Sequence, residues 1–99
     1  MANTYEILWT DLALDELAET VEYLEREFSQ KEIDHLGEEI ERITTIISHN
    51  PTIYPLSDKL KIRKAVILKF NSLYYRVMNG KVEIISFFSN RQSPAKRKI

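Results

Sequence analysis

The sequence predicts an α+β fold in which an N-terminal strand precedes a two-helix antiparallel hairpin, and this hairpin packs on one face of a mainly antiparallel β-sheet (β-α-α-β-β-β). Hydrophobic residues recur every three or four positions through residues 11–50, as in helices, and every second position between residues 59 and 78, as in strands. The dipeptide Asn79-Gly80 is typical of a two-residue β-hairpin turn.

Length and composition indicate a single domain. The chain has 99 residues and 43% hydrophobic content, enough for one modest core, so one domain covers residues 1–99, with a flexible tail from about residue 92. There is no cysteine, and no stretch approaches the roughly 18 apolar residues of a membrane span. We therefore expect a cytoplasmic protein without disulfides.

The first half reads as a strand followed by two helices. Tyr5 to Trp9 alternates as a strand does, and Thr10 provides a hydroxyl N-cap for a helix from about Asp11 to Phe28. The helix has an apolar stripe at spacings of three and four: Leu14, Leu17, Val21, Leu24 and Phe28.

The second helix should start at Ser29, which with Glu32 has the spacing of a capping box, and should end at His49-Asn50-Pro51. Its stripe consists of Ile33, Leu36, Ile40, Ile43 and Ile47. The short connection predicts an antiparallel hairpin, and Gly37 indicates a close helix contact. A coiled-coil dimer seam is the alternative, but each stripe spans under three heptads, which favours packing on the chain's own sheet.

The second half, from Leu60 to Arg91, reads as three strands that follow a loop at residues 49–59. In the first strand the parity containing Ile62 and Val66 should face the helices, which would leave Lys61 and Arg63 on the open face. Asn71-Ser72 is the predicted turn.

In the next strand Leu73, Tyr75 and Val77 should face inward, with Tyr74 and Arg76 outward. The last strand, from Lys81 to about Phe88, is apolar on both parities. This pattern predicts either cover on both sides or a bulge, and it leaves the face of Arg91 open.

Charge is divided between the halves. Residues 1–50 hold 13 acidic and 3 basic side chains, whereas residues 51–99 hold 2 and 11. Because the acidic helices would cover only one sheet face, this division predicts a basic open face whose target is a polyanion or an acidic protein. Mutual neutralisation of the two halves across the fold is the alternative. His35 and His49 have no partners at ligand spacing, so we expect neither a metal nor a cofactor.

The ordered features resemble the RelE/ParE toxin superfamily of plasmid-stabilising type II toxin–antitoxin modules. The features are Trp9 with Ala13 entering the first helix, Pro51 after the second, Arg63, the segment LYYRV at 73–77 and the segment SNRQSP at 89–94. The resemblance covers nearly the whole chain. It implies a cognate antitoxin as partner and, as target, either DNA gyrase for ParE-like members or the ribosome and its mRNA for RelE-like members.

The resemblance also implies site residues. Arg63 and Arg91 match the recurrent arginines of the second and last strands, and Lys61 lies where RNA-cleaving members carry another basic residue. These three would be catalytic only in a nuclease, whereas the target-binding set is Lys61, Arg63, Tyr74, Arg76 and Arg91.

RNA cleavage needs a base for the 2′-hydroxyl as well as stabilisation of the phosphorane charge. Ser89 and Asn90 occupy the region where several nuclease members have a histidine or tyrosine, so the sequence favours a ParE-like gyrase inhibitor. A ribosome-dependent endoribonuclease, or an inactive relative that binds only its antitoxin, remains the alternative.

Overall fold

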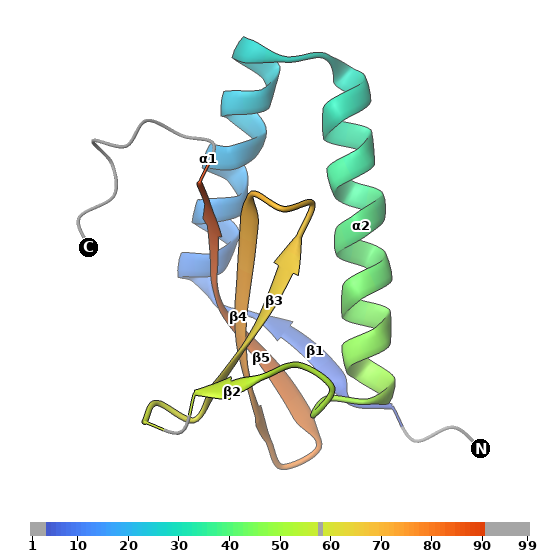
Figure 1. Ribbon diagram of the computed structural model, residues 1–99, viewed down its shortest axis with the longest axis vertical. Coiled ribbons are helices and arrows are strands. Elements are labelled where there is room, and N and C mark those ends of the chain that lie inside the picture. Colours follow the sequence, from blue (N-terminus) through green and yellow to red (C-terminus); the bar gives the residue numbers. More distant parts are fainter. Residues whose placement is uncertain (1–3, 58, 91–99) are drawn as a thin grey trace.

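The computed structural model describes residues 4–57 and 59–90 and confirms the predicted α+β class (Figure 1). A strand and two helices precede a sheet that is antiparallel except where its first strand joins it. The two-residue strand β2 lies within the segment predicted to be a loop. The elements are β1 (Glu6–Trp9), α1 (Asp11–Glu27), α2 (Gln30–His49), β2 (Leu56–Ser57), β3 (Ile62–Ile67), β4 (Asn71–Met78) and β5 (Lys81–Ser89).

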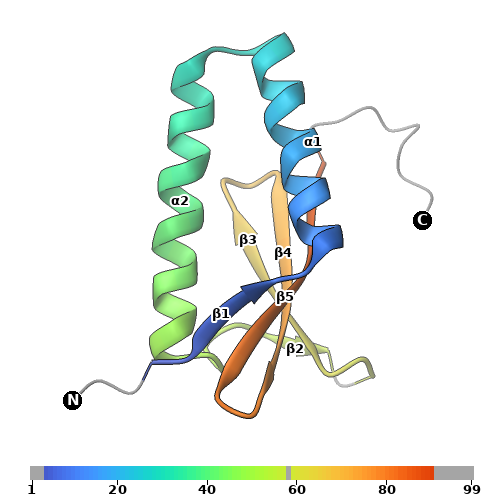
Figure 2. The ribbon, with the colours of Figure 1, turned by 180° about the vertical axis from the view of Figure 1, so that it is seen from behind.

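The strands lie in the order β1-β5-β4-β3-β2, with β1 parallel to β5. The two helices run antiparallel and lie on the same side of the sheet, as Figures 1 and 2 show from opposite directions. The core forms between the helices and this face. Its buried apolar residues are Ala13, Leu24, Leu36, Ile43, Ile47, Ala65, Ile67, Leu73, Tyr75, Val82, Ile84 and Phe87.

Side chains at the start of α1 form hydrogen bonds with the part of β5 that extends beyond its pairing with β1. Thr10 accepts a hydrogen bond from Ala13 N (3.1 Å), which confirms the predicted N-cap, and donates to Ile85 O (3.0 Å). One carboxylate oxygen of Glu16 accepts from Phe87 N (2.9 Å) and from the Ser86 hydroxyl (2.7 Å). Helix α1 therefore satisfies strand groups that have no neighbouring strand.

Three details of the helices differ from the predictions. The buried side of α1 includes Ala13 and Thr20, whereas Leu14 and Phe28 are 48% and 43% exposed, because the small Ala13 side chain faces the core as α1 packs along β5. Ser29 precedes α2, but its side chain makes no capping bond. A Cβ at Gly37 would meet nothing within 4 Å, so the predicted close helix contact is wrong.

The parity predicted for β3 is also wrong. Arg63 pairs with Tyr75 and Ala65 with Leu73, and directly paired residues share a face, so Arg63, Ala65 and Ile67 point toward the helices. Val66 is 55% exposed on the opposite face.

The turn before β4 falls earlier than predicted. It lies at residues 68–70, with Leu68 (φ 52°) and Lys69 (φ 69°) in the left-handed region, whereas Asn71 and Ser72 are buried strand residues. At the next turn Asn79 and Gly80 both have positive φ, as the predicted type I′ turn requires. Of the two alternatives predicted for β5, cover on both sides or a bulge, the structure shows the bulge: the register shifts where Tyr74 pairs with Ser86 and Tyr75 with Ile84.

Candidate functional site

Arg63 lies on the covered side of the sheet, and its guanidinium is committed to the loop after α2. Its Nη1 donates to Tyr54 O (2.7 Å) and to Thr52 O (3.3 Å). The side chain is half-buried and shares the face of Ala65 and Ile67. The predicted position of Arg63 on the open face is therefore wrong, because a one-residue shift in parity moves a strand residue to the other face.

Tyr75 holds the same loop from the neighbouring strand. Its hydroxyl donates to Pro51 O (2.8 Å), and the residue is fully buried. Burial raises the pKa of the Tyr75 phenol, and the nearby positive charge of Arg63 opposes that rise. Arg63 and Tyr75 thus hold the loop at residues 51–54 against the sheet by donating hydrogen bonds to three of its backbone carbonyl groups.

The open face is the side of the sheet opposite the helices. It carries Tyr74 and Arg76, as predicted, and Arg76 Nε donates to Glu83 Oε1 (2.6 Å) on the adjacent strand. The ion pair is largely exposed, so it adds little to stability. The pairing register places further residues on this face: Glu6, Leu8, Lys64, Val66, Met78 and Lys81.

Apolar side chains form a large part of the open face. Leu8, Val66 and Met78 are 39%, 55% and 44% exposed. Tyr74, on the same face, is half-buried. Among the residues that the structure describes, the cations of this face are Lys64, Arg76 and Lys81, and they are offset by the carboxylates of Glu6 and Glu83. The described part of the face is thus less basic than the sequence predicts, and it combines apolar and charged groups as protein-binding surfaces do.

Two of the predicted site residues lie elsewhere. Lys61 is exposed in the loop before β3, at a left-handed backbone position (φ 58°). Arg91 and the tail after it lie outside the described residues. The structure therefore brings Tyr74 and Arg76 together, and it adds Leu8, Val66 and Met78. The outward position of Leu8 follows from the strand alternation alone, whereas that of Val66 requires the register.

Among the described residues, the open face presents no arranged acid–base pair. His35 and His49 are both exposed on α2, and His49 Nδ1 lies 2.9 Å from Thr45 O. The described residues contain no group of three His, Cys, Asp or Glu residues that could hold a metal ion. Nor does any helix in residues 4–57 and 59–90 have the length and apolarity that crossing a membrane requires.

Comparisons with known proteins agree with this architecture. No protein-family model and no curated protein sequence matches the chain. Among solved structures, the chain is similar to one from the chromosomal ParDE TA system from P. aeruginosa, with a TM-score of 0.72. The chain shares its fold with a ParDE component. The match has 12% sequence identity and covers 88% of this chain and 97% of that chain, so the resemblance expected from the sequence is confirmed at the level of the fold.

Proposed function

We propose that this protein is the toxin component of a type II toxin–antitoxin module and that it inhibits DNA gyrase, in the manner of ParE-like proteins, by binding through its open sheet face. The observation that carries the proposal is the composition of this face. Exposed Leu8, Val66 and Met78 are bordered by opposite charges, a pattern that suits a protein partner. The fold shared with a ParDE component supports the toxin–antitoxin assignment.

The position of Arg63 weighs against a RelE-like nuclease. Stabilising a phosphorane requires cationic donors directed at the reacting phosphate. Arg63 instead donates to two loop carbonyls on the other side of the sheet. Within residues 4–57 and 59–90, the open face therefore lacks the Arg63 guanidinium that the nuclease hypothesis requires there, whereas a protein target needs only shape, apolar area and complementary charge.

The antitoxin partner has two suitable surfaces. Exposed Leu14 on α1 and exposed Phe28, the residue that follows the end of α1, offer apolar area to an amphipathic helix. Strand β2 pairs with Ile62 and Arg63, and Lys64 N donates to Pro55 O (3.2 Å), so within the described residues the outer edge of β3 at residues 65–67 is open to an added extended strand.

The test uses purified protein with gyrase and relaxed plasmid, and in parallel with programmed ribosomes whose transcript ends are mapped. Met78→Glu places a charge in the open face, and Leu14→Glu is its matched control because the two side chains are 44% and 48% exposed. We expect wild type and Leu14→Glu to inhibit supercoiling equally and Met78→Glu to lose at least about tenfold in potency, which is the cost of burying an unpaired charge in an interface.

Three results would contradict the proposal. Codon-positioned transcript cuts in the ribosome reaction would assign the protein to the nuclease class. Equal loss of gyrase inhibition in both variants would remove the open face from the mechanism. Unaffected growth on induced expression, together with antitoxin binding, would identify an inactive relative.

A further inference from the structure

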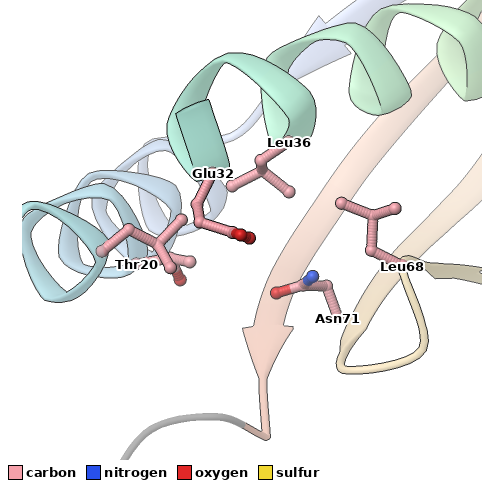
Figure 3. A pocket seen from close by; sticks show the side chains of 6 residues that line it. Thr20, Glu32, Leu36, Leu68 and Asn71 are labelled. Carbon is pink, nitrogen blue, oxygen red and sulfur yellow. The ribbon is translucent and has the colours of Figure 1, made fainter. Parts of the chain in front are cut away.

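A small cavity lies between α1, the first turns of α2 and the turn that joins β3 to β4 (Figure 3). Its volume is about 20 Å³, which fits one water-sized group. A space of this size admits no substrate or cofactor, so recognition of a second molecule outside the open face depends on exposed side chains. Two exposed surfaces of the described chain, one basic and one acidic, have the composition that such recognition needs.

The basic patch lies on the segment that joins β2 to β3, where Ser57 holds the backbone. Lys61 N donates to Ser57 O (2.7 Å), and Leu60 N donates to the Ser57 hydroxyl (3.3 Å). Leu60 is 66% exposed, the largest exposed fraction among the large hydrophobic residues that the structure describes. We define the basic patch as Leu56, Lys59, Leu60 and Lys61, all of which are exposed. It therefore offers apolar area at a defined position, bordered by positive charge.

The acidic patch lies on the exposed side of α1, opposite its buried side. Its members, all exposed, are Asp11, Leu14, Asp15, Ala18 and Glu22. Asp11, Asp15, Ala18 and Glu22 follow one another at spacings of three and four, and Leu14 lies beside them, one turn before Ala18. Among the described residues, the three carboxylates of this patch form no ion pair, and neither do the lysines of the basic patch. The two patches therefore combine exposed leucine with opposite, unpaired charge.

The elements that carry the two patches lie on the same side of the molecule. Figures 1 and 2 show α1 and β2 at one side and α2 at the other. When two complementary patches lie apart on one side, a two-fold rotation about an axis perpendicular to the line between them places each patch against its counterpart in a second copy. We propose that this chain forms a two-fold symmetric dimer in which the basic patch of each copy contacts the acidic patch of the other.

The leucines and the charges contribute differently to this dimer. Leu60 of one copy, packed near Leu14 of the other, removes apolar surface from water, and the symmetry repeats this contact. Exposed ion pairs add little affinity, but opposite charges fix the orientation of the two copies and make their association depend on salt. The net charge of −1 leaves almost no overall repulsion between copies to oppose the contact.

The dimer uses no residue of the open face, so this inference goes beyond the proposed inhibition of gyrase and is independent of it. It assigns the exposed Lys61 to a contact between copies, in place of the target-binding role that the resemblance implies. Leu14 also belongs to the surface offered to the antitoxin, so an antitoxin bound there would compete with the dimer.

Charge reversal on the full chain tests both patches. Lys61→Glu and Asp15→Lys each bring like charges together at both contacts of the dimer, so each should raise its dissociation constant at least about tenfold in sedimentation velocity measurements. Leu60→Ser, which removes apolar area without a change of charge, should raise it as well. Lys81→Glu on the open face and Glu38→Lys on α2 are the matched controls, because both side chains are exposed, and they should leave it unchanged.

Mixing the two charge-reversed chains identifies the pairing directly. An equimolar mixture of Lys61→Glu and Asp15→Lys places opposite charges at both contacts of a mixed dimer, so it should restore a dissociation constant close to that of wild type. Equal far-ultraviolet circular dichroism of all chains is the control for folding. The proposal would be overturned by wild type that stays monomeric up to about 1 mM, by a mixture that associates no better than its components, or by an equal loss in Lys81→Glu and Lys61→Glu.

Discussion

Arg63 and Arg76 lie on adjacent strands of one sheet but on opposite faces, and their surroundings differ accordingly. Arg63 is half-buried and donates to two backbone carbonyls of a loop, which cannot move away independently of the fold. Arg76 is exposed and pairs with the side chain of Glu83, which solvent can replace. Arginine on the covered face therefore serves structure, whereas arginine on the open face is available to a partner.

The apolar residues of the two faces show the same contrast. Leu73 on β4 is fully buried and packs within the core formed with the helices. Val66, on the opposite face of the neighbouring strand, keeps 55% of its surface in contact with water. Burial on the covered face drives folding, whereas exposure on the open face leaves apolar area for a later binding event.

The largest expected effect separates these two apolar positions. Leu73→Ala should lower the free energy of unfolding by about 2–5 kcal/mol, because it removes core contacts and leaves a cavity. Val66→Ala should change it by less than about 0.5 kcal/mol, as exposed substitutions do. Urea unfolding measures both, and comparable losses would mean that the open face is covered in the folded protein.

The second prediction compares the two arginines. Arg63→Met should cost about 1–3 kcal/mol, because it removes donors from Thr52 O and Tyr54 O, whereas Arg76→Met should cost under about 1 kcal/mol as the loss of an exposed ion pair. Arg63→Lys is the control, because lysine keeps the positive charge but lacks the planar guanidinium that donates to the two carbonyls. If Arg76→Met lowered the free energy of unfolding more than Arg63→Met does, the structural role would belong to the open-face arginine and the comparison would be contradicted.

The fold class could be predicted from sequence because its signals are local. Thr10 stands where its hydroxyl can cap the first helix, and Asn79-Gly80 supplies the two left-handed residues of a hairpin turn. Alternation along β4 placed Tyr74 and Arg76 outward without reference to any other strand. These features depend on residues within a few positions of one another, and all were correct.

The side on which Arg63 lies could not be predicted, because both parities of β3 contain apolar residues. The choice is made by pairing with β4, where Ala65 meets Leu73, and a slip of one residue exchanges the two faces. The turn was missed for a related reason. Leu68 and Lys69 adopt a left-handed conformation that their residue types disfavour, while Asn71, a good turn former, is used within the strand.

The third prediction concerns the buried phenol that shares the loop with Arg63. Tyr75→Phe should cost about 1 kcal/mol, since Pro51 O loses its donor. The folded state raises the pKa of Tyr75, chiefly by burial, so its contribution is fully present below the unfolded pKa near about 10 and is lost as pH rises through the folded pKa. Stability measured from pH 8 to 11 should fall less steeply in Tyr75→Phe, and identical slopes would contradict this assignment.

The smallest predicted effect is at a position that belongs to neither face. Gly37 lies within α2, is exposed, and has no atom within 4 Å of where a Cβ would stand. Gly37→Ala should therefore raise the free energy of unfolding by about 0.5–1 kcal/mol, because alanine restricts the unfolded chain and favours the helix. Loss of stability would mean that this part of α2 has a neighbour. The same substitution should leave gyrase inhibition unchanged, because α2 packs on the side of the sheet opposite the proposed binding face.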